Sequence, residues 1–161
     1  NEERAANIVF TLNRFILVEK HKNPVYETLT DKVERILELW KKKIKDYRKI
    51  YEEGTEIVAA ANKLTARQKN LRFSNLEYSV LLTLEKKFTE ITQLVQDTKE
   101  LSLLIEKHMF SGWILQKTAR KNIEGDVRRF LRRYIKEFGR GMQVLDELYQ
   151  KIMDNVMNYG E

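Results

Sequence analysis

Apolar residues recur every three or four positions along almost the whole chain, while the strict alternation typical of strands is absent. This period predicts an all-α, bundle-like domain of about six to eight helices, including one long helix. The first helix carries Ala5, Ile8, Leu12, Phe15 and Ile16 on one face. Later apolar faces are expected at residues 76–88, 91–105, 123–138 and 142–156. We expect all 161 residues to form a single domain, 1–161.

Capping residues predict where several of these helices begin. Asn23 followed by Pro24 is typical of an N-cap and a first-turn proline. Ser74 and Glu77 match a capping box. The segments "MFSGW" and "FGRGM" predict turns before and after the helix at 123–138.

The long helix is predicted from Thr30 to about Leu64. Its apolar positions alternate steps of four and three, which is typical of a helix packed along its length against neighbours. The basic run "KKKIKDYRK" does not interrupt that alternation, and the boundaries near Lys41–Asp46 stay open. The positions that carry the pattern are Val33, Leu37, Trp40, Ile44, Tyr47, Tyr51 and Val58.

The helix that contains "VRRFLRRYIKEF" has two different faces. On a helical wheel its apolar residues fall within an arc of roughly 140°, and we expect this arc to be buried. Cationic side chains fill most of the opposite half. The apolar set is Ile123, Val127, Phe130, Leu131, Tyr134, Ile135 and Phe138, and the cationic set is Arg120, Lys121, Arg128, Arg129, Arg132, Arg133 and Lys136.

Charge makes this cationic face the main candidate for function. The chain has 30 basic and 24 acidic residues, a net charge of +6. Residues 116–140 contain nine basic and three acidic residues, so this segment alone accounts for that excess. Such a concentration favours an anionic partner, either DNA phosphates or an acidic protein surface. A plain solvated face is the alternative that the sequence leaves open.

Motifs for catalysis or cofactor binding are missing from the sequence. It has no cysteine, no phosphate-binding glycine loop, and two histidines without metal-ligand spacing. His108 is interpreted as a partly buried structural residue. Glu85-Lys86-Lys87 spells half of a nuclease site but lacks a strand context. We therefore expect no catalytic residue, no metal, no cofactor and no enzymatic activity in this chain.

Other aromatic and basic residues have simpler interpretations. Trp40, Tyr47 and Tyr51 follow helical spacing and favour core packing over base stacking. The basic run at 41–49 is flanked by glutamates and is interpreted as a solvated face. Apolar runs are too short to cross a bilayer, so no membrane association is expected, and the cytoplasm is the expected location. The chain opens without methionine, which suggests a piece of a longer protein.

Three segments in order resemble the C-terminal helical domain of type I restriction enzyme motor/endonuclease (R) subunits. "KNPVYETLTDKVERILELW" resembles the family's Asn-Pro stretch and the amphipathic helix after it. "RFSNLEYSVLLTL" resembles its later cap-Glu-aromatic stretch. "GWILQKTARKNIEGDVRRFLRRY" resembles its terminal tryptophan, basic spacer and arginine-rich helix. Together they span roughly Phe15 to Tyr134.

The resemblance implies a parent that is an ATP-dependent DNA translocase and endonuclease of a restriction-modification system. Its nuclease and motor domains would lie outside this chain. The helical domain would dock the motor onto the modification (methyltransferase) subunit by protein-protein interaction. The rival hypothesis is a nucleic-acid-binding helical module whose arginine-rich helix contacts the DNA backbone.

Overall fold

The computed structural model describes residues 1–139 and 142–160, and every regular element within them is helical. The predicted all-α class is therefore confirmed, with eight α-helices over the described residues. The predicted turn at "FGRGM" includes Arg140 and Gly141, which lie outside the described part of the chain.

The chain divides into two compact units, residues 1–73 and 74–161, where the sequence predicts one domain. Each unit has its own apolar core. The boundary was not visible in the sequence because no proline, glycine or low-complexity linker marks it. Arg72 instead ends the preceding helix in a left-handed conformation, with φ of 58°.

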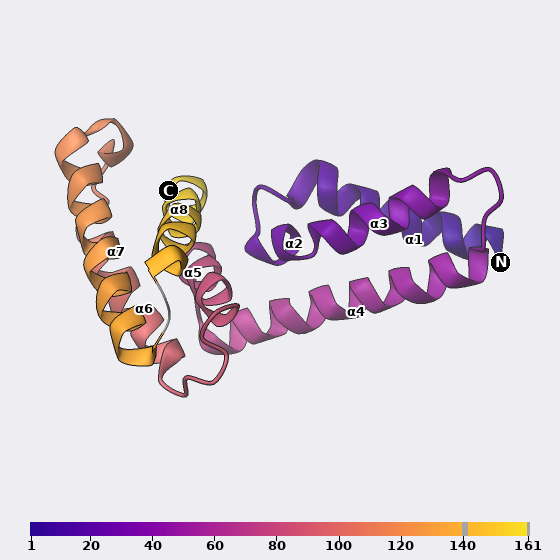
Figure 1. Cartoon of the computed structure of the whole chain (residues 1–161). Coiled ribbons are helices and arrows are strands. Elements are labelled where there is room, and N and C mark those ends of the chain that lie inside the picture. Colours follow the sequence, from indigo (N-terminus) through magenta and orange to yellow (C-terminus); the bar gives the residue numbers. More distant parts are fainter. Residues whose placement is uncertain (140–141, 161) are drawn as a thin grey trace. The chain divides into compact units, whose positions relative to one another are not determined.

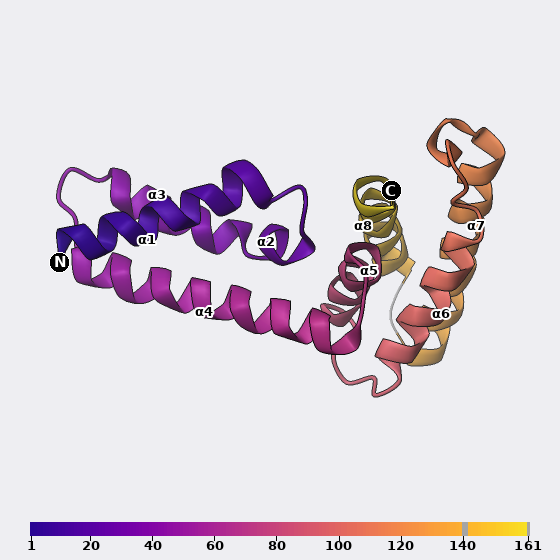
Figure 2. The same ribbon diagram turned by 180° about the vertical axis from the view of Figure 1, so that it is seen from behind.

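The first unit is built from three long elements and two short ones (Figure 1). They are α1 (Glu2–Arg14), a π-helical turn (Phe15–Glu19), α2 (Pro24–Thr28), α3 (Thr30–Lys41) and α4 (Tyr47–Leu71). α1, α3 and α4 pack against one another, and each runs opposite to the one before it (Figures 1 and 2). Their shared core includes Leu12, Ile36, Ile50 and Ile57.

The predicted helix from Thr30 to Leu64 is wrong, because α3 ends at Lys41 and α4 starts at Tyr47. Four lysines lie between residues 41 and 45, and their mutual repulsion disfavours a continuous helix there. The Asp46 side chain accepts a hydrogen bond from the Lys49 amide at 3.1 Å, which caps α4. Ile44, predicted to lie on the packed face, is 90% exposed.

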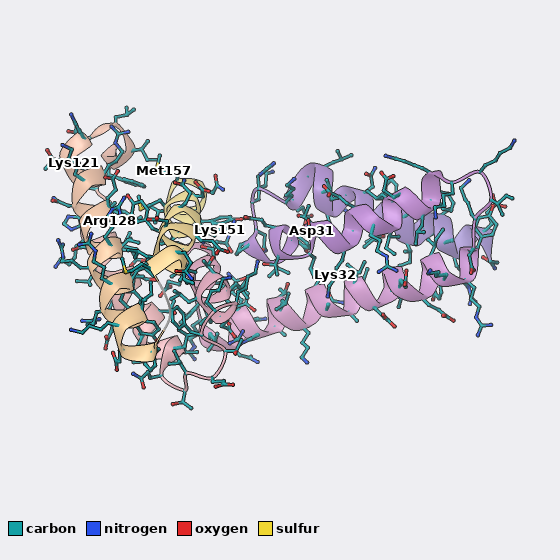
Figure 3. All side chains as sticks on the ribbon, in the orientation of Figure 1. Asp31, Lys32, Lys121, Arg128, Lys151 and Met157 are labelled. Atoms are coloured by element: carbon teal, nitrogen blue, oxygen red, sulfur yellow. The ribbon has the colours of Figure 1, made fainter. Side chains whose placement is uncertain are left out.

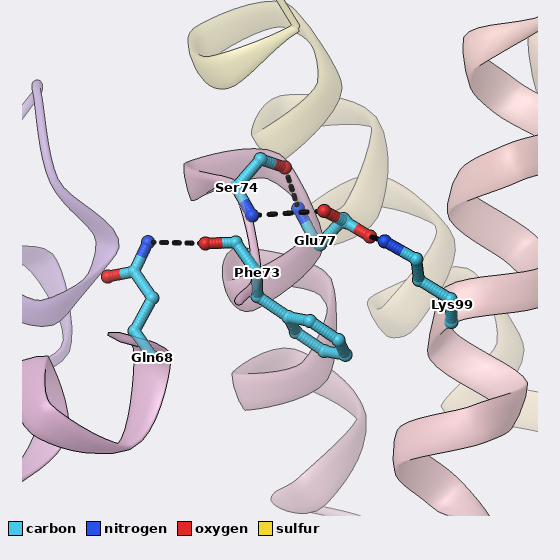
Figure 4. Close-up of polar contacts among 5 residues, drawn as sticks. All are labelled: Gln68, Phe73, Ser74, Glu77 and Lys99. Carbon is cyan, nitrogen blue, oxygen red and sulfur yellow. Dashed lines mark hydrogen bonds and ion pairs between the residues drawn. The ribbon is translucent and has the colours of Figure 1, made fainter. Parts of the chain in front are cut away.

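Predicted caps occur where expected. The Asn23 side chain accepts a hydrogen bond from the Val25 amide at 2.9 Å, and Pro24 occupies the first turn of α2. Ser74 and Glu77 form the reciprocal capping box at the start of α5, as Figure 4 shows. These pairs satisfy amide groups that a helix start otherwise leaves without partners.

The second unit is a four-helix arrangement of α5 (Asn75–Glu85), α6 (Leu94–Glu106), α7 (Lys117–Phe138) and α8 (Met142–Tyr159). A short 3₁₀ turn, Trp113–Leu115, precedes α7. Each helix packs on the next, and α8 returns to pack on α5, so the four helices enclose one core (Figure 2). This closure lets α7 bury one face while its opposite face stays outside the bundle.

Polar contacts to α6 and α8 fix α5 within the second unit. The buried Asn155 amide of α8 donates to the Ser79 carbonyl at 3.2 Å and to the Thr83 hydroxyl at 2.9 Å. Glu77 pairs with Lys99 of α6 (Figure 4). Burial alone would raise the pKa of Glu77, but hydrogen bonds from Lys99 and Ser74 outweigh it and lower that pKa.

Candidate functional site: the cationic face of α7

The buried face of α7 agrees with the predicted wheel. Six of the seven predicted apolar positions are buried, and Phe138 at the helix end is half-buried. Ala119 extends the same face toward the N-terminus. α7 ends at Gly139, whose φ of 74° is a left-handed conformation that glycine adopts without strain.

An aromatic cluster holds this helix in place. Tyr134 stacks on Phe130 at 4.9 Å between ring centroids and meets the edge of Phe88 at 5.0 Å. Its hydroxyl donates to the Asp97 carboxylate of α6 at 2.7 Å. Burial and this carboxylate raise the pKa of Tyr134 well above its ordinary value, so the phenol stays a donor. The rotation of α7 is thereby fixed by Asp97 of α6 and by Phe88 in the segment that follows α5.

Six of the seven cationic candidates are exposed, and Arg128 is half-buried. Figure 3 labels Lys121 and Arg128 on α7. The exposed set spans about four turns of the helix, roughly 24 Å at 1.5 Å per residue. Its members are Arg120, Lys121, Arg129, Arg132, Arg133 and Lys136. At 100° per residue five of its members share one side, and Arg120, in the first turn, lies toward the apolar side.

Three of the seven candidates make contacts within their own unit. The Arg128 guanidinium lies over the Tyr149 ring of α8, with Cζ 3.9 Å from the ring centroid. Arg129 donates to the Asp126 carboxylate at 2.5 Å. The Arg133 Cζ lies 5.7 Å from the Phe130 centroid. Arg128 therefore contributes to packing of α7 on α8 as well as to the charge of the face.

Asp126 also reaches a residue that follows α6. Its second carboxylate oxygen lies 3.1 Å from His108 Nε2, and both side chains are largely buried. His108 is thus a partly buried residue with a polar partner, as its position in the sequence indicates. The Asp126–Arg129 pair follows from a spacing of three on one helix, whereas the contacts to His108 and Tyr149 depend on tertiary structure.

The four remaining candidates, Arg120, Lys121, Arg132 and Lys136, are all exposed. Within the described residues no acidic side chain forms an ion pair with any of them. Their charges are therefore available to an anionic ligand. Arginine offers a planar set of donors that fits carboxylates and phosphates equally well.

The other sequence candidates do not assemble into a site. Glu85 and Lys86 lie at the end of a helix, and Lys87 pairs with Glu147 at 3.5 Å. Lys45 lies over the Trp40 ring at 5.5 Å, in the first unit. Within residues 1–139 and 142–160, no three histidine or acidic side chains gather as metal ligands.

Fold and surface together define an all-α protein with a rigid helix that presents cations. Among the described residues, the helices are too short or too polar to cross a membrane. Comparison of the chain with protein-family models, with curated proteins and with solved structures finds no match.

Proposed function

We propose that this chain is a helical assembly domain of a type I restriction motor/endonuclease subunit. In this proposal the cationic face of α7 docks the ATP-driven translocase onto the modification subunit in the cytoplasm. The observation that carries it is the set of exposed cations on a helix whose rotation is fixed by its core. The three ordered segments that resemble the R-subunit family supply the identity of the complex.

A docking role suits the physical character of this face. Its cations project from a helix that is already formed, so binding has to order their side chains but not the backbone. A partner surface rich in Asp and Glu would form charge-assisted hydrogen bonds with Arg120, Arg132 and Lys136. Electrostatic complementarity of this kind increases the association rate and fixes the orientation of the partners. The chain itself would carry no reaction step and hold no cofactor.

Direct binding to the DNA backbone is the second candidate, because the same exposed cations can contact phosphates. Phosphate contacts release counterions, so affinity would fall steeply with salt concentration. We favour the protein partner because the resemblance assigns DNA pulling to domains outside this chain.

The test reverses Arg120, Arg132 and Lys136 to Glu. The matched control reverses three exposed lysines of the first unit, Lys42, Lys43 and Lys49, for the same change in net charge. Each variant is made in the full motor subunit and tested for capture by the modification complex. We expect the α7 variant to lose capture and the control to retain it.

Duplex DNA retardation by the isolated chain separates the two candidates. Equal capture by both variants, together with weak DNA binding that only the α7 variant loses, would favour the backbone-binding role. Equal capture and no DNA binding by any variant would reject both roles and leave a solvated face.

A further inference from the structure

A groove in the first unit lies between the start of α3 and the C-terminal half of α4, with a volume of about 920 Å³. Its apolar lining includes Leu29, Ala60, Leu64 and Leu71. Leu29 directly precedes α3, and the other three lie on α4. All of these residues belong to one compact unit.

The apolar floor of the groove is formed mainly by α4. The apolar face of this helix is longer than the part that the other helices of the unit cover. Apolar or small residues follow one another at steps of four and three from Ile50 to Ala61, and all of these are buried. The same steps continue to Leu64, Gln68 and Leu71, which are only half-buried, so one polar residue interrupts the apolar series there. This spacing is the one that helices use to receive side chains from a neighbouring helix. Three turns of α4 therefore have a packing face with room for another element.

The two helices that form the walls of the groove, α3 and α4, both contribute cations. Lys32 belongs to α3, and Lys63 and Arg67 lie one turn apart on α4. Figure 3 labels Lys32 on α3. The groove lining contains no acidic residue among those the structure describes. Between Ile57 and Leu76 the sequence has four basic residues and no acidic one.

We propose that this groove binds an acidic amphipathic helix of a partner protein. An apolar floor suits the apolar face of such a helix, and cations on both walls suit acidic residues on its two flanks. From Ala60 to Leu71 the floor is roughly 17 Å long, or three helical turns. The site is in a different unit from the α7 face and does not depend on the function proposed for that face.

Other anionic ligands fit the groove less well. A lipid-like anion has one charged end, whereas the cations Lys32 and Arg67 of the groove come from two different helices. Nucleic acid would leave the apolar floor without a partner, since the phosphate backbone is charged throughout. An acidic helix satisfies the floor and both walls at once.

The experiment measures binding of a labelled peptide to the whole chain by fluorescence anisotropy. The probe is a capped amphipathic peptide of about 18 residues, long enough to form a helix, with leucines at steps of three and four and glutamates on both flanks. A second peptide has lysine in place of every glutamate. We expect the acidic peptide to bind and the basic peptide not to bind.

Two charge-reversal variants locate the binding site. Lys63→Glu with Arg67→Glu changes the groove, and Lys49→Glu with Lys69→Glu makes the same charge change at exposed positions of α4 outside it. The groove variant should weaken binding of the acidic peptide by about tenfold or more and gain binding of the basic peptide. The control should change affinity by no more than about threefold, since exposed charges are screened by salt.

Three results would overturn the proposal. The first is failure of the acidic peptide to bind wild-type protein. This includes the case in which dodecanoate, tested as a lipid-like anion, binds and the peptide does not. The second is an equal loss of affinity in the groove and control variants. The third is a dimer of the chain that the groove variant dissociates, because the occupant would then be a second copy.

Discussion

Gly54 offers a test of how α1 packs against α4. It is buried in the middle of α4, and a Cβ atom placed there would overlap Cγ2 of Ile8 and lie 3.4 Å from Cδ1 of Leu12. Cγ2 branches directly from the Ile8 Cβ, so it can move only if χ1 changes or α1 shifts. Gly54→Ala gains about 1 kcal/mol of helix propensity but incurs an overpacking cost of about 1–3 kcal/mol. Because the overlap is with a carbon that cannot swing away, we place the cost in the upper part of that range and expect a net loss of about 1–2 kcal/mol.

Gly125 is a matched control in α7. A Cβ atom there would meet only the end of the flexible Arg129 side chain, at 3.2 Å. Gly125→Ala should therefore stabilise the second unit by up to about 1 kcal/mol. The same substitution is thus expected to act in opposite directions at two helical glycines, because only one of them lies against another helix.

Tryptophan fluorescence can follow the two units separately, because each contains one of the two tryptophans, Trp40 and Trp113. In a Trp113→Phe background, urea unfolding reports on the first unit. With a slope of about 1–2 kcal/mol/M, the expected loss lowers the midpoint by roughly 0.5–2 M. In an Ile8→Ala background, Gly54→Ala should become neutral or stabilising. A stabilising Gly54→Ala in the presence of Ile8 would show that α1 does not pack on α4 as described.

Three further predictions concern the second unit. Leu131 is fully buried in α7, so Leu131→Ala should destabilise by about 2–5 kcal/mol, whereas the exposed Arg132→Ala should change stability by roughly 0.5 kcal/mol; equal shifts in thermal melting would contradict the orientation of α7. The buried Ser102 hydroxyl has no hydrogen-bond partner among the described residues, so Ser102→Ala should raise the melting temperature, and a lowered one would refute this. Glu77 has a pKa below its ordinary 4.5, so its ion pair with Lys99 stabilises the fold above pH 4.5, and this stabilisation is lost as the pH falls further. Glu77→Gln should therefore make acid unfolding less dependent on pH. An unchanged pH profile of unfolding would contradict this prediction.

Local chemistry explains which parts of the fold could be predicted from the sequence. The Asn23-Pro24 start and the Ser74–Glu77 box depend on residues within three positions of each other, and both occur as predicted. The break between α3 and α4 does not follow from apolar spacing, which continues through the lysine run. Ile44 fits that spacing, but it lies in the loop between α3 and α4 and its side chain is exposed.

For the candidate face on α7, too, only features that lie within one helix could be predicted from the sequence. The wheel identified which side of α7 is buried, because all the residues concerned belong to one helix. It did not identify the stacking of Arg128 on Tyr149 or the contact of His108 with Asp126, because these join residues 18 or more positions apart. Sequence analysis therefore located the charges but could not tell which of them also serve packing.

The net charge of the chain gives no indication of the groove. Residues 116–140 account for the net charge of +6, so the rest of the chain sums to zero. That zero includes a stretch from Ile57 to Leu76 with four cations and no anion, balanced by acidic residues elsewhere. Only the fold shows that Lys63 and Arg67 of α4 line one groove together with Lys32 of α3 and several apolar residues.

The difference between these two cationic surfaces predicts different responses to salt. On α7 the exposed candidates offer charge without an apolar floor, so binding there should weaken steeply between about 0.1 and 0.5 M salt as the Debye length shortens from roughly 10 Å to below half of that. In the groove, Leu29, Leu64 and Leu71 would contribute apolar burial that salt does not screen. Binding of the acidic peptide should therefore fall less over the same range than capture through α7. Titrations of both interactions at matched salt concentrations measure this directly. Equal salt dependence would mean that the groove acts only through its charges and that its apolar floor is not used.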